Sequence, residues 1–237
     1  MQPCFAPFCS GTTSRPFVVA QLGQSLDGRI ATVTGDSKYI NGGAALDHLH
    51  ALRAHVDAVV VGVGTVAADD PLLTVRRTPG VSPARVVIDP SGRLPAAAAC
   101  LADDGARRIV VGGSDRPGAP PPGVEFLRVE RGRDGLLAPA AIVAALGRAG
   151  FARILIEGGA RTVSDFLAAA CVDRLHMLVA PVLIGSGKAG LDLPVVETLA
   201  GALRPATRTF LLDGGDVLFD CDLRAEAGSE SMEESPS

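Results

Sequence analysis

Short apolar runs recur along almost the whole chain, separated by turns and by a few longer segments of helical period. Most runs are rich in Val and Ile and bounded by Gly, Pro or Asp, which is typical of buried strands. The strand-like runs are 17–22, 58–63, 85–88, 108–111, 124–129, 153–156, 175–184, 209–212 and 217–219. Because these runs are short and continuous, they predict strands that are buried on both faces of a sheet.

Three segments between these runs have helical character: 44–54, 139–149 and 162–170. In the first, Ala45, Leu49 and Leu52 share one stripe with Asp47 opposite, and Arg53 lies at the edge of that stripe. The alternation of strands and helices predicts an α/β fold whose central sheet is mostly parallel, with an antiparallel part near the C-terminus.

The pattern predicts one domain over residues 16–223. Residues 1–15 read as a flexible N-terminal arm, and residues 224–237 are small, polar and acidic, which indicates disorder. No internal repeat or long linker divides the chain.

Composition narrows the function classes. Hydrophobic residues make up 47% and aromatic residues only 4%, so the core is aliphatic, which favours α/β over an aromatic-rich β-sandwich. A net charge of −4 argues against a nucleic-acid partner, and no apolar run approaches the roughly 20 residues that span a membrane. The five cysteines are scattered without a CxxC pair, so we expect no metal site. No secretory signal is evident, and we expect a cytoplasmic protein.

The segment 65–76, TVAADDPLLTVR, directly follows a strand-like run and carries the most distinctive chemistry. The carboxyl end of a buried strand is where open α/β sheets bind ligands. Taken alone, Asp69 is most simply a turn residue and Arg76 a surface charge. Together with Arg53, however, Arg76 forms a plausible phosphate clamp, because guanidinium groups bind phosphate bidentately.

The segment 156–167, IEGGARTVSDFL, runs from a strand through two glycines into a helix. Glycines let the backbone approach a ligand, and a helix N-terminus attracts the phosphates of a dinucleotide. Arg161 suits a 2′-phosphate, which favours NADP over NAD. The alternative is an ordinary tight turn, since the pattern is not GxGxxG. Glu157, at the end of the strand, either caps backbone N–H groups or faces a ligand.

The segment 22–40 supplies a third loop after a strand. Asp27 is most simply a turn-capping residue and Ser37 a structural hydroxyl. The three loops follow three different strands and can converge on one edge of the sheet. The four histidines read as helix-surface or strand residues, and no Ser-His-Asp or Cys-His order indicates nucleophilic catalysis.

Taken together, the motifs SLDGRIA, GDSKYI, TVAADDPLLTVR, VVIDP and IEGGA, in this order over 17–222, resemble the riboflavin-pathway pyrimidine reductases, the reductase half of bifunctional deaminase-reductases. The resemblance implies a dihydrofolate-reductase-like three-layer fold and a homodimer. It also implies NADPH-dependent reduction of the ribose of 5-amino-6-(5-phosphoribosylamino)uracil, or of its diamino-pyrimidinone precursor. The zinc-deaminase motifs are absent, so the chain looks like a stand-alone reductase.

The resemblance also implies roles for individual residues. The implied cofactor contacts are Gly23, Tyr39, Thr65, Asp69, Gly159, Ala160, Arg161, Thr162, Val163, Ser164 and Asp165. The implied substrate contacts are Ser37, Arg53, Leu73, Arg76 and Glu157, with the arginines near the substrate phosphate. Asp69 and Glu157 are the candidate catalytic residues for proton delivery.

Three positions depart from the family pattern. Tyr39 replaces a common tryptophan, Pro90 replaces a small polar cofactor contact, and Gln21 replaces a lysine that points at the substrate in many members.

Two alternative functions stay open. A dihydrofolate or pterin reductase would need a helix carboxylate for the pteridine, for which Asp47 is poorly placed, and a non-catalytic nucleotide-binding relative is suggested by Gln21.

Overall fold

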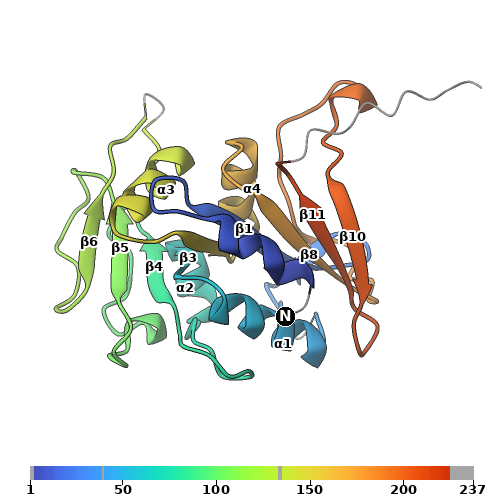
Figure 1. Ribbon diagram of the computed structural model, residues 1–237, viewed down its shortest axis with the longest axis horizontal. Helices are drawn as coiled ribbons and strands as arrows, with labels where there is room; N and C mark the ends of the chain where they lie inside the picture. Colours follow the sequence, from blue (N-terminus) through green and yellow to red (C-terminus); the bar gives the residue numbers. More distant parts are fainter. Residues whose placement is uncertain (1–2, 39, 133–134, 225–237) are drawn as a thin grey trace, which may run out of the picture.

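A single large sheet organises the protein (Figure 1). The computed structural model describes residues 3–38, 40–132 and 135–224. The sheet has nine strands in the order β10-β11-β8-β1-β7-β3-β4-β5-β6. Their bounds are β1 Phe17–Ser25, β3 Ala58–Gly62, β4 Ala84–Ile88, β5 Arg108–Gly112, β6 Glu125–Arg128, β7 Arg153–Glu157, β8 Arg174–Ala180, β10 Ala206–Leu211 and β11 Val217–Asp222. All strands from β8 to β6 in this order pair in parallel, whereas β11 pairs antiparallel with both β8 and β10. The predicted sheet, mostly parallel with an antiparallel C-terminal part, is confirmed.

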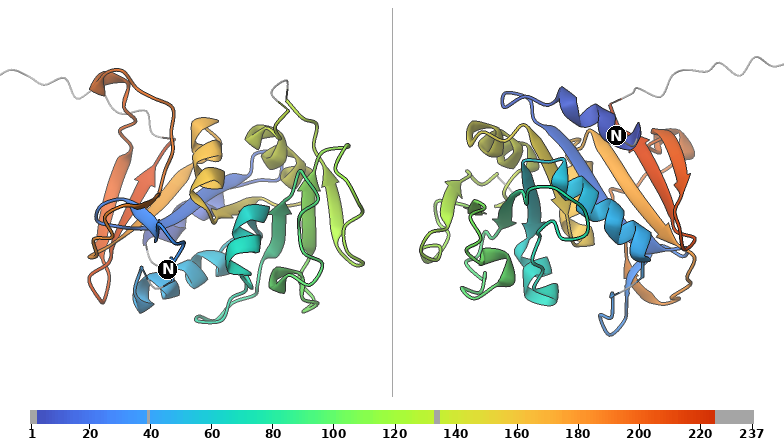
Figure 2. Two further views of the ribbon diagram at one scale, coloured as in Figure 1. Left: turned by 180° about the vertical axis from the view of Figure 1, so that it is seen from behind. Right: turned by 60° about the horizontal axis from the view of Figure 1, so that its bottom comes forward.

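Helices cover both faces of this sheet, which gives three layers (Figure 2). Two helices, α1 (Gly43–Ala54) and α2 (Val63–Asp69), lie on one face, and α3 (Pro139–Arg148) and α4 (Ala160–Ala168) lie on the other. Short 3-10 segments are η1 (Pro3–Ser10), η2 (Ala99–Leu101) and η3 (Leu199–Gly201). No helix in the described part of the chain is both long and apolar enough to cross a membrane.

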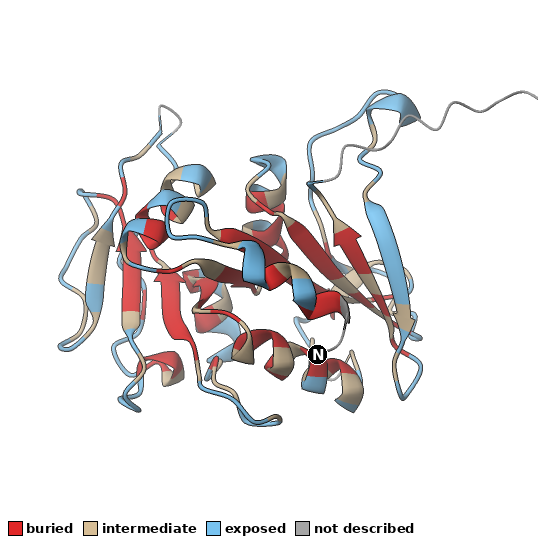
Figure 3. Ribbon diagram, viewed as in Figure 1, coloured by how far each residue is buried: buried red, intermediate tan, exposed pale blue. Residues whose placement is uncertain are grey.

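Alternation along the strands produces two aliphatic cores. On β1, Val18, Ala20 and Leu22 pack toward α3 and α4, whereas Phe17 and Val19 pack toward α1 and α2. The central strands are buried, whereas β10 is exposed along most of its length (Figure 3). Burying a Val, Leu or Ile side chain contributes about 1.5–3 kcal/mol, so these two cores set the position of the helices.

The N-terminal segment differs from the expectation of a flexible arm over 1–15. Residues Pro3–Ser10 form η1, in which Cys4, Phe5 and Phe8 are buried. Phe5 stacks on His48 of α1 and on His55, its C-cap, with ring centroids 5.4 and 4.5 Å apart. Aromatic burial therefore orders a segment whose mixed composition resembles a tail. Apart from Arg224, the predicted tail 224–237 lies outside the described residues.

Two further elements were not anticipated. Helix α2 follows β3 and includes Asp69, for which the sequence taken alone predicts a turn. A two-stranded antiparallel sheet joins β2 (Arg29–Thr32) to β9 (Gly187–Ala189). Strand β8 ends at Ala180, before Pro181, because proline cannot donate to the ladder.

Candidate functional site

The three predicted loops leave the same edge of the sheet, because β1, β7 and β3 are neighbours and run in parallel. Gln21 on β1 is in register with Glu157, the last residue of β7. The Thr65 hydroxyl, in α2 after β3, accepts a hydrogen bond of 2.8 Å from the Gly159 N–H after β7. Parallel neighbours thus bring together residues far apart in the sequence, as predicted.

A buried ion pair lies beside this junction. The Arg53 Nε donates to Glu157 Oε2 over 2.9 Å, and its Nη2 pairs with Glu157 Oε1. The remaining nitrogen, Nη1, donates to the Thr74 carbonyl oxygen over 3.0 Å. Arg53 and Glu157 are 5% and 9% exposed. Every nitrogen of the guanidinium therefore binds protein, so the structure does not present Arg53 as half of an open phosphate clamp.

The segment 73–77 is held against α1 in an unusual conformation. Leu73 is buried and has a φ of 56°, a region that costs a non-glycine residue about 1–2 kcal/mol. The Arg76 N–H donates to Nδ1 of the buried His50 over 2.9 Å. The Arg76 guanidinium lies at the surface, where Nη1 donates to the Thr74 hydroxyl over 2.8 Å. Burial, followed by the charges of Arg53 and Arg76, lowers the pKa of His50 to about 4.

The two adjacent aspartates have different positions. Asp69 is the last residue of α2 and its side chain is exposed. Asp70 is the C-cap, with a φ of 40°, and its Oδ1 accepts a hydrogen bond of 2.7 Å from the Ala99 N–H. Asp70 therefore anchors the turn, whereas Asp69 faces solvent at the carboxyl edge of the sheet.

The turn from β7 into α4 leaves backbone donors uncapped. Gly158 has a φ of 123°, and a Cβ there would lie 3.1 Å from the Thr65 hydroxyl. Gly159 is the N-cap of α4 and no side chain caps it. The first N–H groups of a helix have no partner within the helix, so this turn is suited to an anion such as a pyrophosphate.

Two residues in the first turns of α4, Val163 and Ser164, face the protein interior rather than the turn after β7. Val163 is fully buried in the core, and Ser164 Oγ accepts a hydrogen bond of 2.9 Å from the Asp192 N–H. Ala160 is also buried and Thr162 is half-buried, whereas Arg161 and Asp165 are exposed with 3.8 Å between Nε and Oδ2. Only the backbone of the buried positions is available for the predicted cofactor contacts.

Comparison with known proteins places this chain in a family. The sequence profile of the RibD C-terminal domain matches residues 16–204. The chain belongs to the RibD C-terminal domain family. A 2,5-diamino-6-ribosylamino-4(3H)-pyrimidinone 5′-phosphate reductase of Methanothermobacter thermautotrophicus is 33% identical over 217 residues, which cover 87% of this chain and 97% of that protein. The resemblance to the riboflavin-pathway pyrimidine reductases is thereby confirmed.

Solved structures agree with this assignment. RibD of Acinetobacter baumannii superposes with a TM-score of 0.73 at 30% identity over 87% of this chain, which spans 58% of that RibD chain. Dihydrofolate reductase of Enterococcus faecalis covers 87% of this chain and 96% of its own, with a TM-score of 0.51 at 12% identity, a likeness of fold alone. The dihydrofolate-reductase-like fold is confirmed.

The loop before α1 of this RibD-family chain is tied to the C-terminal hairpin. The buried Asp216, between β10 and β11, accepts hydrogen bonds from Asn41 Nδ2 (3.0 Å) and the Gly42 N–H (2.7 Å). Asn41 lies against Gly23, where a Cβ would be only 2.0 Å from Asn41 Oδ1. Ser37 is half-buried in the same loop. Tyr39 lies outside the described residues.

Asp27 is a capping residue, as its sequence context suggests. Its carboxylate accepts hydrogen bonds from the Ser25 hydroxyl and from the N–H groups of Ile184 and Gly185. These bonds lower the pKa of Asp27 to about 2, with the Ser25 hydroxyl as the main cause. Asp27 thus joins the end of β1 to the loop after β8.

The two departures from the family pattern that lie within the described residues, Gln21 and Pro90, occupy different settings. Gln21 is 7% exposed and lies in register with Glu157 on one side and His176 on the other. Pro90 follows β4, and its carbonyl oxygen accepts a hydrogen bond of 2.9 Å from Arg131.

Sequence reasoning missed His50, Thr74 and Asp216. The signal for His50 was its position three residues before Arg53, which places both on one face of a helix. For Asp216 no sequence signal existed, because its partners are more than 170 residues away.

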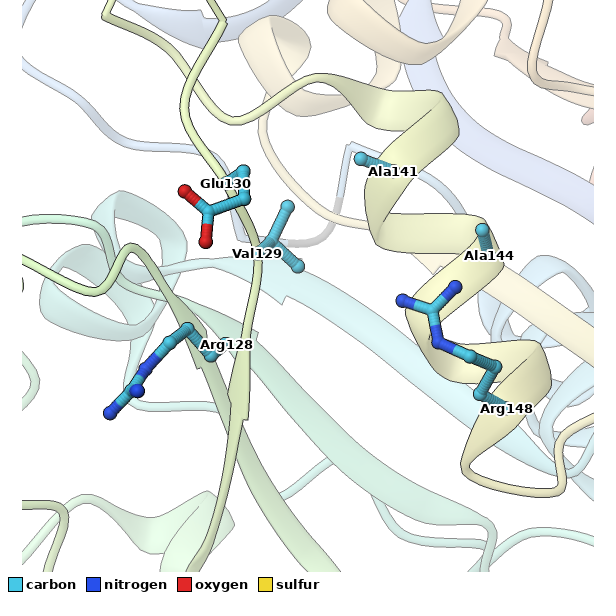
Figure 4. Close-up of a pocket in the computed structure, with 6 residues that line it drawn as sticks. All are labelled: Arg128, Val129, Glu130, Ala141, Ala144 and Arg148. Carbon is cyan, nitrogen blue, oxygen red and sulfur yellow. The ribbon is translucent and has the colours of Figure 1, made fainter.

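A surface cleft of about 320 Å³ lies elsewhere, between β6 and α3. Ala141, Ala144 and Arg148 on α3 face the segment from Arg128, the last residue of β6, to Glu130, and the Arg128 guanidinium points away from the helix (Figure 4). None of the predicted site residues lines this cleft. The cleft lies beside β6, the edge strand, which β3, β4 and β5 separate from β7.

Proposed function

We propose that this chain catalyses NADPH-dependent reduction of the ribose of a 5-phosphoribosylamino-pyrimidine to its ribityl form, a step of riboflavin biosynthesis. The observation that carries the proposal is that the loops after β1, β7 and β3 leave one edge of the sheet, with Arg53 bound to Glu157 and Thr65 bound to Gly159. The relative from Methanothermobacter thermautotrophicus is named as a reductase of such a substrate. Both the uracil and its diamino-pyrimidinone precursor are candidates.

The residues at the start of α4 fit a dinucleotide. The uncapped N-terminus of α4 and the backbone of Gly158 and Gly159 suit the pyrophosphate. The exposed Arg161 is the side chain we assign to a 2′-phosphate, which is why we propose NADPH rather than NADH. Thr65 holds the turn in place, and Asp69 lies one α2 turn further on for the nicotinamide end.

The bound cofactor supplies hydride to C1 of the opened sugar. Ring opening moves a proton from the amine nitrogen to the ring oxygen, and reduction then adds a proton to that nitrogen. Both oxygens of Glu157 already accept hydrogen bonds from Arg53, so we assign Glu157 to accepting a substrate hydroxyl or N–H. We assign proton transfer to Asp69, directly or through water, because its carboxyl group is exposed.

The exposed guanidinium of Arg76 is the group we assign to the substrate phosphate. Arg53 contributes indirectly, because its Nη1 holds the Thr74 carbonyl two residues away. Leu73 is buried, so we expect it to shape the wall of the site.

The assignment is tested with Asp69→Asn and Glu157→Gln, with Asp70→Asn as the matched neighbour. NADPH oxidation is followed with the phosphoribosylamino-pyrimidine as substrate. We expect kcat/KM to fall about 100-fold or more for both site variants and to stay near wild type for Asp70→Asn. If both site variants keep near wild-type kcat/KM, the assignment is wrong. Oxidation with dihydrofolate instead indicates a pterin reductase, and binding without oxidation indicates a non-catalytic relative.

We also propose a homodimer and a cytoplasmic location. Strand β10 lies at the edge of the sheet and is exposed along most of its length, and an open edge can pair with another strand. Size-exclusion chromatography with light scattering tests the dimer, and a monomeric mass at micromolar concentration contradicts it.

A further inference from the structure

His50 has no role in the assignments above, yet it is buried at the base of the segment that carries Arg76. It is 4% exposed and lies on α1 three residues before Arg53. Its Nδ1 lies 2.9 Å from the Arg76 backbone nitrogen. Because a backbone N–H can only donate, Nδ1 must be the acceptor, and any proton of the neutral ring is on Nε2.

A second hydrogen bond from the same face of α1 holds the same segment. Arg53 donates to the Thr74 carbonyl over 3.0 Å, two residues before the Arg76 N–H that His50 accepts. Together these bonds fasten a backbone that is already strained at Leu73. The Arg76 guanidinium is bound within the segment itself, through the Thr74 hydroxyl. Its position therefore follows the backbone that α1 holds.

We propose that His50 is a positioning residue that sets Arg76 for recognition of the substrate's phosphate group. The inference rests on the proposed function, which assigns Arg76 to that phosphate. A guanidinium on a mobile segment would lose side-chain and backbone freedom on binding, whereas a pre-organised one does not. His50 thus contributes to affinity for phosphorylated ligands without touching them.

The surroundings of His50 favour its neutral form. The charged groups that face it are Arg53 on α1, Arg76 and Arg77 on the segment after α2, and Glu157 on β7. Burial is the largest cause of the lowered pKa of His50, and the three cationic groups among these four add to it. A second proton would sit on Nδ1 and remove the acceptor for the Arg76 N–H.

The test compares His50→Leu, which removes the acceptor, with His50→Asn, whose side-chain oxygen can reach the position of Nδ1. For the phosphorylated substrate we expect His50→Leu to raise KM about tenfold, with kcat within about twofold and an unchanged KM for NADPH. His50→Asn should recover most of the loss. His55→Leu, the same change at the C-cap of α1, should leave both KM values unchanged.

Two further comparisons separate positioning from a general loss of structure. With a substrate that lacks the phosphate, His50→Leu and wild type should behave alike. In the double variant with Arg76→Ala, the effects should not add, because both changes remove the same contact. An equal effect on both substrates, or additive effects, overturns the proposal.

Equilibrium binding of ribose 5-phosphate, measured against ribose by calorimetry, gives the same comparison without turnover. If Arg76→Ala loses the preference for the phosphate and His50→Leu keeps it, the positioning role of His50 is wrong while the role of Arg76 stands. If wild type shows no such preference, both are wrong. If wild type prefers the phosphate, responds to both changes and does not reduce the pyrimidine, the proposed function fails and the positioning role stands.

Discussion

Two buried ionic clusters lie side by side beneath α1, and they differ in whether they reach the surface. The site cluster comprises His50, Arg53 and Glu157. The closed cluster comprises His48, His176, Asp220 and Arg174. In register across β7, β1, β8 and β11, the residues Glu157, Gln21, His176 and Asp220 form one buried polar row that joins the two clusters.

The closed cluster is linked internally by short polar contacts, although His176 Nε2 makes no hydrogen bond of good geometry among the described residues. His48 Nε2 lies 3.0 Å from His176 Nδ1, His176 Nε2 lies 3.2 Å from Asp220 Oδ1, and Arg174 binds both oxygens of Asp220. Phe5 of η1 stacks on His48, with ring centroids 5.4 Å apart. Burial, followed by the neighbouring His176, lowers the pKa of His48 to about 3.

The site cluster uses similar residue types but leads outward, through His50 and Arg53, to the exposed Arg76. A histidine with a lowered pKa and a buried ion pair therefore do not identify a functional site by themselves, since the closed cluster has both. The site cluster differs because its buried His50 and Arg53 hold the backbone that carries the exposed guanidinium of Arg76. Changes in the closed cluster should reduce stability, whereas changes in the site cluster should reduce activity.

The largest expected effect on stability comes from Asp220→Ala, which leaves Arg174 buried without its main partner. Breaking a buried pair in this way costs about 3–5 kcal/mol. We expect the free energy of unfolding in urea to fall by this amount, while kcat/KM of the folded fraction stays within about twofold. A large loss of kcat/KM in folded protein would show that the closed cluster also serves the site.

Phe5→Ala should have the next largest effect on stability, because it removes the aromatic ring that packs on His48 of the closed cluster. Replacing a buried phenylalanine by alanine typically costs about 3–5 kcal/mol, and we expect the lower end here because η1 is terminal. The measurement is again urea unfolding, with Leu199→Ala as the control, since Leu199 is 76% exposed. Equal midpoints for the two variants would mean that η1 adds little to the fold.

The smallest effect, over the range from pH 6.5 to pH 5, is the pH dependence that His48 imposes on stability. Its pKa is near 6.5 in an unfolded chain and about 3 in the fold. Between these values the unfolded state binds more protons, so stability falls as the pH is lowered, by about 1.4 kcal/mol per unit below pH 6.5. His50, with a pKa near 4, acts in the same direction.

His48→Gln keeps a donor toward His176 and removes one titrating group. We expect a flatter fall of unfolding free energy between pH 6.5 and pH 5 than in wild type. An unchanged slope would show that His48 does not stay neutral in the folded protein.

Local pattern determined much of the architecture. Continuous Val- and Ile-rich runs predicted the nine strands of the main sheet, and helical period predicted α1, α3 and α4. Both patterns arise because the buried faces of a strand or helix require apolar residues at regular spacing. Parallel order then brought Thr65, Glu157 and Gly159 to one edge, as expected. The family motifs carried the assignment of function.

Only the tertiary structure decided how each charged group is used. The sequence alone cannot distinguish Arg53, whose nitrogens all bind protein, from the exposed Arg76. Nor can it show that Asp216 holds the loop before α1, or that Phe5 covers His48. These contacts join residues up to 175 positions apart, and a side chain's partner depends on which strands become neighbours. Local propensity and period carry no information about that choice, so it emerges only when the sheet is assembled.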